Sequence, residues 1–374
     1  RRRDHGTVIF IDLRDRTGLT QVVFNAERNA AVHQGGHTLR SECVVSITGQ
    51  VMARPDESKN ANLSTGEIEV FVDAAEVLNE SKTPPFVIED DAEVTEAIRL
   101  KYRFLDLRRP RMQKLVKTRH DIAQAVRGFL NKEAFLEIET PILTKSTPEG
   151  ARDYLVPSRV NPGTFFALPQ SPQLFKQVLM VSGMDRYYQI ARCFRDEDLR
   201  NDRQPEFTQI DLEMSFVDRL DVMTLMEKMI VTVFREAGGV QLPTPFPRMT
   251  YAEAMGRYGS DKPDLRFDMP LYDVTAFGAA SEFKVFKDAA TKGGLVKALI
   301  VKGGAATPRS RIDALGETAK SFGAKGLAWL KITPEGQLES VIAKFLDAKA
   351  FAAALPEAKP GDLVLFGADK PAVV

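Results

Sequence analysis

The chain of 374 residues carries 51 Lys and Arg against 51 Asp and Glu, so its formal net charge is zero, and 44% of its residues are hydrophobic. This balance excludes a uniformly basic, histone-like protein and an acidic disordered tail, and the length predicts two or three globular domains. A nucleic-acid partner stays open, because charge can be zoned along a neutral chain.

The first residues give no targeting signal. The chain begins with Arg1-Arg2-Arg3, without an initiator Met or an apolar signal segment, so we expect a fragment cut at both ends. Cys43 and Cys193 are too far apart for a CxxC pair, which favours a reducing cytoplasmic location. No apolar run reaches the ~18 residues that span a bilayer, which excludes membrane insertion.

The first predicted domain, residues 1–80, is a small β-barrel. Alternating apolar residues predict a hairpin over 8–13 and 19–24 and further strands over 43–52 and 67–78. The polar segment between them contains a predicted break at Gly35-Gly36. Short strands with one intervening helix predict a five-stranded oligonucleotide-binding (OB) fold, whose first strand is expected before Arg1.

A hinge is predicted over residues 81–110, because residues 81–85 read Ser-Lys-Thr-Pro-Pro. Charge is zoned just beyond it, since residues 99–127 contain ten basic and two acidic side chains. This basic stretch is either a solvated helix face or, beside an OB barrel, a surface that faces phosphates.

The rest of the chain predicts two further domains. In residues 111–264, apolar spacing predicts a helix that ends near Asn131 and helices over about 173–181 and 221–236, with strands dominating 153–216. Strand and helix signals alternate in residues 265–374, which predicts an inserted α+β module. The expected fold class is therefore α+β with several domains.

Common nucleotide and metal motifs are absent from the sequence. It contains no GxxxxGK[ST] loop, no GxGxxG after a strand and no HExxH. His5, His33, His37 and His120 have no metal-ligand spacing and are interpreted as surface residues.

The densest charged segment, residues 194–207, lies between two β-patterned stretches. Side chains two apart on a strand share a face, so Arg195 and Glu197 are expected to point the same way. An arginine there can neutralise a phosphate, and a carboxylate can accept from an adenine amine or help to place Mg²⁺. The alternative is a solvated hairpin loop.

Four spaced segments together resemble one family. FRDEDLRNDRQPEFTQIDLEMSF, residues 194–216, is similar to motif 2 of the class II aminoacyl-tRNA synthetases. FLNKEAFLEIETPIL, residues 129–143, resembles their motif 1, with Pro141 as its proline. TPEGARDYLVPSR, residues 147–159, and ALPQSPQLFKQ, residues 167–177, resemble the bacterial aspartyl branch. The resemblance implies an OB anticodon-binding domain followed by an antiparallel-sheet catalytic domain.

The resemblance also assigns an ATP site. It implies that Arg195 is the catalytic arginine, which contacts the α-phosphate and the amino acid carboxylate and stabilises charge during in-line attack. Glu197 is expected to face the adenine amine and Phe207 to stack on adenine, a core aromatic being the alternative for Phe207. The implied ATP-binding residues are Arg195, Asp196, Glu197, Gln204 and Phe207.

An aspartate substrate needs a cation for its side-chain carboxylate and acceptors for its ammonium group. Lys176, one helical turn after Gln173, is expected to supply the cation, while Glu149, Gln173 and Asp211 serve the ammonium group. The alternative for Lys176 is a surface helix residue. A lysine-activating relative needs acidic groups there, and an asparagine-activating relative needs no buried cation. The implied aspartate-binding residues are Glu149, Gln173, Leu174, Phe175, Lys176, Arg195 and Asp211.

The resemblance places an anticodon site on the barrel. Phe10 is expected to stack on a base, with barrel core as its alternative, while Gln21 and Glu69 read base edges. Arg3 and Asp4 are expected near the RNA. In this family His at the position of His5 often accompanies charging of both tRNA(Asp) and tRNA(Asn), which leaves tRNA(Asn) open as a second partner.

The chain departs from the family at its far end. Motif 3, the acidic Mg²⁺ ligands and a later substrate-binding arginine are absent, so we expect no metal ligands in this fragment and no activity from it alone. The implied intact enzyme is an aspartate–tRNA ligase that uses ATP and Mg²⁺, forms a homodimer through motif 1 at Pro141 and works in the cytoplasm. The alternatives are an asparaginyl- or lysyl-type synthetase and a synthetase-like protein that binds RNA without catalysis.

Overall fold

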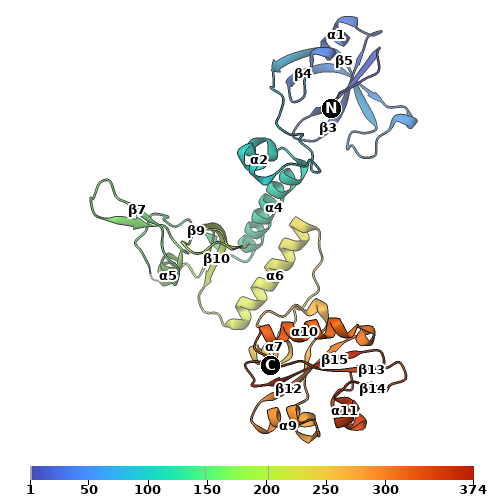
Figure 1. Ribbon diagram of the computed structural model, residues 1–374. Helices are drawn as coiled ribbons and strands as arrows, with labels where there is room; N and C mark the ends of the chain where they lie inside the picture. The colour runs from blue at the N-terminus through green and yellow to red at the C-terminus, as the bar shows by residue number, and fades with distance from the viewer. Residues whose placement is uncertain (1, 148, 201) are drawn as a thin grey trace. The chain divides into compact units, whose positions relative to one another are not determined.

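The computed structural model describes residues 2–147, 149–200 and 202–374. Arg1, Pro148 and Asn201 lie outside the described residues. Pro148 and Asn201 belong to segments that carry the family resemblance, and Arg1 is the residue at which we expected the fragment to begin. The chain divides into two compact units, Arg1–Pro243 and Thr244–Val374 (Figure 1).

The first unit starts with a five-stranded sheet. Its elements are β1 Arg2–Asp4, β2 Val8–Arg14, β3 Leu19–Asn25, α1 Ala30–Thr38, β4 Val44–Ala53, the 3₁₀ helix η1 Asp56–Ser58 and β5 Ile68–Asn79. The strand order is β1-β2-β3-β5-β4, with β3 and β5 parallel and the other pairs antiparallel. Ile9, Val22, Phe24 and Val72 form its core.

Two details of this domain add to the sequence-based expectations. The short strand β1 at Arg2–Asp4 was not predicted, because its charged residues carry no apolar signal; the expectation of a first strand before Arg1 stays a prediction. The predicted break at Gly35-Gly36 was wrong, since α1 runs through both residues. Gly36 lets α1 pack closely against Phe24, because a Cβ at this position would lie only 3.0 Å from Cγ of Phe24.

Three helices follow the barrel: α2 Glu96–Lys101, α3 Arg103–Asp106 and α4 Pro110–Lys132. Six of the ten basic side chains of residues 99–127 bind acceptors of the same chain. Arg109 is the most buried of these six, and its NH1 lies 3.2 Å from Oδ1 of the fully buried Asp106. These bonds indicate that many basic side chains of residues 99–127 stabilise the fold of the chain itself.

The remaining elements of the first unit are β6 Leu136–Glu137, β7 Leu155–Pro157, β8 Phe165–Ala167, α5 Gln173–Val181, β9 Arg186–Phe194, β10 Glu206–Met214 and α6 Arg219–Gly238. Strands β10, β9 and β6 form a three-stranded sheet. Strand β9 is central, antiparallel to β10 and parallel to β6, and β7 pairs with β8 separately. Val126 and Leu130 of α4, Leu225 of α6 and Tyr188 of β9 share one core. The predicted helix over 173–181 is confirmed at α5.

The second unit is a five-stranded antiparallel sheet with helices on both faces. Its elements are α7 Tyr251–Tyr258, η2 Leu265–Phe267, β11 Leu271–Asp273, α8 Thr275–Ala280, α9 Lys284–Thr291, β12 Leu295–Val301, η3 Gly304–Ala306, α10 Arg309–Ser321, β13 Ala328–Ile332, β14 Leu338–Glu339, η4 Ala343–Phe345, α11 Ala348–Ala354 and β15 Leu363–Asp369. The strand order is β11-β12-β15-β13-β14.

Successive side chains of β15 point to opposite faces of the sheet, so each face has its own apolar core. Val364 and Phe366 point into the core shared with α8, α9 and α11, while Leu363 and Leu365 pack with Ile312 of α10. Figure 1 shows α10 on one side of this sheet and α9 and α11 on the other.

The second compact unit begins at Thr244, earlier than the 265 predicted for the last domain. Helix α7 belongs to this unit, because the ammonium group of Lys297 on β12 donates a hydrogen bond to the carbonyl of Gly256.

Cys43 and Cys193 are free thiols. Within the described ranges, no helix combines the length and apolar character needed to cross a membrane.

Candidate functional site

Lys176 lies at the centre of a charged cluster in the first unit. Its Nζ is 2.9 Å from Oδ1 of Asp211 and 3.2 Å from Oε2 of Glu213, and its side chain is only 12% exposed. Burial lowers the pKa of the ammonium group, but the two carboxylates outweigh this effect and raise the pKa. The alternative of a surface helix lysine was therefore wrong.

Local structure explains this cluster. Asp211 and Glu213 are two residues apart on β10, so both side chains lie on one face of the strand. Strand β10 is paired with β9 along its whole length, which fixes this face relative to α5. Gln173 opens α5 one turn before Lys176 and is half-buried.

A buried hydrogen-bond network places Glu149. Ser171 Oγ donates to Oε2 of Glu149 at 2.8 Å. Gln170, which is 1% exposed, accepts from the amide of Ala151 and donates to its carbonyl and to Asp153. The loop that carries Glu149 is thereby fixed to the segment that precedes α5.

The buried thiol of Cys193 is influenced by four predicted site residues. Burial raises its pKa to about 11, the charges of Asp211 and Glu149 also raise it, and those of Arg195 and Lys176 lower it. Lys176 and Asp211 are in direct contact, at 2.9 Å.

The expected shared strand face of Arg195 and Glu197 was wrong. Strand β9 ends at Phe194, and the amide of Arg195 donates to the carbonyl of Pro205 at 2.9 Å. Pro205 has no N–H to return, so the ladder cannot continue. Glu197 lies in an exposed loop, 3.8 Å from Arg203.

Arg195 packs its guanidinium over Phe207, with its Cζ 5.0 Å from the ring centroid. Its Nε is buried and makes no hydrogen bond within the part of the chain that the structure describes. No carboxylate of the described residues forms an ion pair with it. Arg195 is thus a half-buried cation available to a ligand, held against an aromatic ring.

The remaining predicted residues are less tightly connected. Asp196 and Gln204 are exposed, and none of the bonds found in the described residues involves the Gln204 side chain. On α5, Leu174 is 53% exposed and Phe175 is half-buried. Sequence reasoning missed Glu213, Gln170 and Ser171; the alternation Asp211-x-Glu213 could have identified the first.

The barrel carries a second cluster. The Nε2 of Gln21 donates to Oε2 of Glu69 at 2.7 Å, and both side chains are buried. Arg3 donates to Gln21 at 2.9 Å and to Asp12 at 3.1 Å, and its guanidinium lies 5.9 Å from the Phe10 ring. The structure thus brings four predicted residues together, and we name Arg3, Phe10, Asp12, Gln21 and Glu69 the barrel-face cluster.

Other predicted barrel residues flank this cluster. The ring of His5 stands edge-on to Phe10 at 5.7 Å, and Asp4 is 3.3 Å from Nδ1 of His37. Sequence reasoning missed Asp12 and Arg54, whose Nε lies 4.0 Å from Glu69.

Pro141 is exposed, as are its neighbours Ile142 and Leu143. Leu115 and Val116 of α4 are also more than half exposed. This motif 1 region therefore presents apolar side chains that the chain itself does not cover.

Across residues 2–147, 149–200 and 202–374, no group of three or more His, Cys, Asp or Glu side chains is arranged to hold a metal ion. No chemical step is assigned to Mg²⁺.

Two family matches cover most of the chain. Residues 95–351 match the family described as tRNA synthetases class II (D, K and N). Residues 1–78 match the OB-fold nucleic acid binding domain.

Curated relatives are similar along nearly the whole chain. The "Aspartate--tRNA(Asp/Asn) ligase" of Desulfatibacillum aliphaticivorans is 60% identical over 98% of this chain and 62% of that relative. The protein of the same name from Bacillus subtilis is 58% identical over 100% of this chain and 64% of that relative. The chain therefore spans slightly less than two thirds of these relatives' length.

Solved structures share the fold at lower identity. Asparaginyl-tRNA synthetase from Pyrococcus horikoshii, complexed with asparaginyl-adenylate, has a TM-score of 0.60 and 20% identity over 99% of this chain and 87% of that chain. A putative aspartyl-tRNA synthetase from Leishmania major has a TM-score of 0.57 and 24% identity over 64% of this chain and 48% of that chain.

Proposed function

Because the chain belongs to the class II tRNA synthetases of the aspartate, lysine and asparagine group, we propose that the protein carrying it is an aspartate–tRNA ligase. The proposed reaction joins aspartate to ATP, giving aspartyl-adenylate and pyrophosphate, and then transfers the aspartyl group to the 3′ end of tRNA(Asp). The names of relatives at 58–60% identity support it. The activity is proposed for a protein of the relatives' length.

The observation that carries the proposal is Lys176 between Asp211 and Glu213. A buried ammonium group can receive the side-chain carboxylate of aspartate. Asp211, whose Oδ2 is buried without a hydrogen-bond partner among the described residues, and Glu149 are proposed to accept from the substrate ammonium group. Gln173 is proposed to contribute beside them, with Leu174 and Phe175 flanking the site on α5.

For ATP, we assign the catalytic role to Arg195. Its guanidinium stabilises negative charge on the α-phosphate as the aspartate carboxylate attacks, and its buried Nε has no competing protein acceptor among the described residues. The Phe207 ring packs against this guanidinium and is proposed to stack on adenine. Asp196, Glu197 and Gln204 are also proposed to contact ATP; all three side chains are exposed in the loop between β9 and β10.

The barrel-face cluster, with Asp4 and His5, is proposed to bind the anticodon. Phe10 offers a half-buried ring for base stacking, and the amide and carboxylate of Gln21 and Glu69 offer hydrogen bonds to base edges. The relatives' names include tRNA(Asn) beside tRNA(Asp), and His5 makes tRNA(Asn) a proposed second substrate.

Further parts of the proposal concern assembly and organisation. The exposed apolar residues around Pro141 support a homodimer interface. We retain the domain limits 1–80, 81–110, 111–264 and 265–374, the cytoplasmic location and the use of Mg²⁺ as predictions. Residues 1–374 alone are expected to give no aspartate-dependent exchange.

The test compares three amino acids in ATP–pyrophosphate exchange. The chain is completed to the relatives' length with the remaining residues of the Bacillus subtilis protein. Exchange with aspartate and not with asparagine or lysine supports the proposal. Preference for asparagine or lysine favours the other synthetase types, and RNA binding without any exchange favours a non-catalytic protein.

A further inference from the structure

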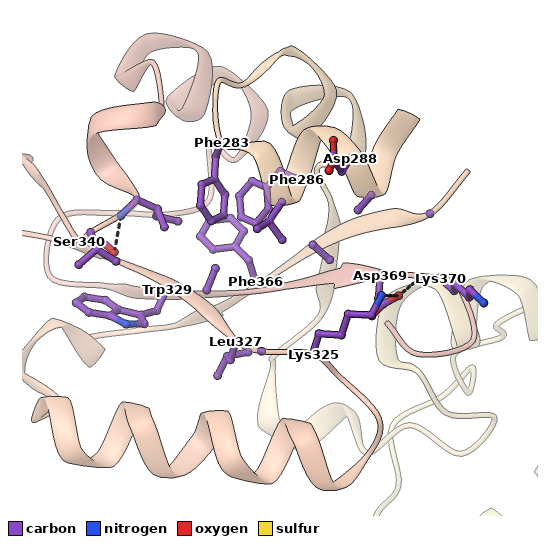
Figure 2. Close-up of a pocket in the computed structure, with 18 of the residues that line it drawn as sticks. Phe283, Phe286, Asp288, Lys325, Leu327, Trp329, Ser340, Phe366, Asp369 and Lys370 are labelled. Carbon is purple, nitrogen blue, oxygen red and sulfur yellow. Dashed lines mark hydrogen bonds and ion pairs between the residues drawn. The ribbon is translucent and has the colours of Figure 1, made fainter. Parts of the chain in front are cut away.

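The second compact unit contains a cavity of about 670 Å³. It lies between helix α9, the strands β13 and β15, and the segment Ser340–Ile342. Figure 2 shows Trp329 and Ser340 at one end of this cavity and Lys325, Asp369 and Lys370 at the other. Its volume falls in the range of small-molecule sites, about 300–1,000 Å³.

The sheet topology explains why the cavity is open. Strand β14 pairs with β13 only at Lys331 and Ile332. The preceding residues Ala328 and Trp329 pair only with β15. The edge of the sheet is therefore uncovered beside these two residues, and the cavity opens there.

The apolar wall rests on fixed rings. Phe286 and Phe366, which are 0% and 1% exposed, lie behind the surface of the cavity with their rings 5.2 Å apart. The ring of Phe283 stands edge-on to Phe286 at 4.8 Å. Because these rings are fixed by the core of the second unit, the cavity does not need to be created by a ligand.

The charged rim has a basic excess. Its acidic members are each close to a lysine: Asp288 is 3.8 Å from Lys292, and Asp369 is 3.4 Å from Lys325. Hydrogen bonding by the Lys370 amide, with the charge of Lys325, lowers the pKa of Asp369. Two further lining cations, Arg309 and Lys370, are not matched by lining carboxylates.

Arg309 joins the rim to the apolar wall. Its Cζ lies 4.9 Å from the centroid of the Trp329 ring, which is cation–π geometry. Its Nε donates to Asp313, a residue outside the cavity, at 2.8 Å. No hydrogen bond of the terminal guanidinium N–H groups is found within the described residues, so these groups can bind an incoming anion.

The geometry points to a binding site for a small organic monoanion with an apolar body, held by the partly exposed Phe283, Leu327 and Trp329 of the apolar wall and by Arg309 at the rim. This binding does not depend on aspartate, ATP or tRNA. The basic excess selects an anion over a cation of the same shape, since the two carboxylates of the rim are already paired.

Trp329 gives a direct readout, because it is the single tryptophan of the chain. The probe is octanoate, which combines an apolar chain with one carboxylate, titrated into the 374-residue protein below the onset of micelles. We expect a saturable shift of Trp329 emission. Octylammonium, with the same body and opposite charge, and acetate, with the charge and no body, should each bind at least about tenfold more weakly.

Two variants separate specific binding from adventitious insertion. Arg309→Gln should weaken octanoate binding about tenfold, while Arg311→Gln, a control that removes an exposed charge from the same helix outside the cavity, should not. Arg309 is exposed and its ion pair is on the surface, so its loss should leave the fold intact. Absence of a saturable shift, equal binding of octanoate and octylammonium, or an unchanged affinity in Arg309→Gln would each overturn the proposal.

Discussion

The ammonium group of Lys176 is bonded to Oδ1 of Asp211, and the second oxygen of that carboxylate, Oδ2, is buried without a hydrogen-bond partner within the described residues. The pair therefore offers both signs of charge to a ligand. A substrate carboxylate can share Lys176, while a substrate ammonium can satisfy Oδ2. The side chain of aspartate brings a carboxylate to Lys176, whereas the side chain of lysine would bring a second cation to it.

Replacing Arg195 tests the proposed ATP chemistry. Arg195→Ala should reduce ATP–pyrophosphate exchange by a factor of about 100 or more, because the developing phosphate charge loses its cation. Arg192→Ala is the matched control, since Arg192 is an exposed β9 residue paired with the exposed Glu206 at 2.8 Å. Near-normal exchange in Arg195→Ala, or an equal loss in the control, would contradict the role.

Replacing Glu69 tests the anticodon assignment. Glu69→Ala removes the acceptor that holds Gln21 at 2.7 Å, so binding of a tRNA(Asp) anticodon stem-loop should weaken about tenfold. Glu76→Ala removes an exposed carboxylate from the same strand and should bind normally. Fluorescence anisotropy at fixed salt measures both affinities, and equal affinities in the two variants would count against the barrel-face cluster.

Replacing either of two neighbouring glycines of α1 with alanine should have opposite effects on stability. A Cβ on Gly36 would lie 3.0 Å from Phe24, so Gly36→Ala should destabilise the protein by about 1–3 kcal/mol. A Cβ on Gly35 meets nothing within 4 Å, so Gly35→Ala should be neutral or stabilising by up to about 1 kcal/mol. Urea unfolding measures both, and similar effects of the two changes would refute this packing.

The bond between Arg127 and Glu137 predicts a pH dependence. Arg127 on α4 donates to both oxygens of Glu137 on β6, at 2.9–3.1 Å, and this hydrogen bonding lowers the carboxyl pKa. A depressed pKa contributes stability above the ordinary glutamate value, 4.5, and the contribution is lost as pH falls through the folded value.

Glu137→Gln should therefore melt below the wild type above pH 4.5, with the gap closing at lower pH. The gap should be modest, because both side chains are more than a third exposed. A gap that does not change with pH would show that the charge of Glu137 contributes nothing.

Local patterns predicted most elements but few contacts between them. Apolar spacing predicted α5 at its observed bounds, because its partly buried residues Phe175, Leu179 and Met180 recur at helical spacing. It failed at Gly35-Gly36, where the close approach of α1 to Phe24 requires a glycine that local propensity disfavours.

For the candidate site, too, the residues could be identified but the contacts between them could not. The family resemblance identified Lys176, Asp211 and Arg195. The pairing of Lys176 with both Asp211 and Glu213 depends on the register of β9 and β10 and on how α5 packs. The end of β9 before Arg195 depends on its pairing opposite Pro205. Such long-range geometry has no signature within a single segment.

The most direct test of the central claim is the aspartate requirement of Lys176→Met in the completed protein. The aspartate concentration for half-maximal exchange should rise about 10–100-fold, while the ATP concentration for half-maximal exchange changes little. Lys228→Met, at an exposed lysine of α6, serves as the control and should match the wild type. Equal increases in both requirements, or an unchanged aspartate requirement, would contradict the claim that Lys176 receives the substrate's side-chain carboxylate.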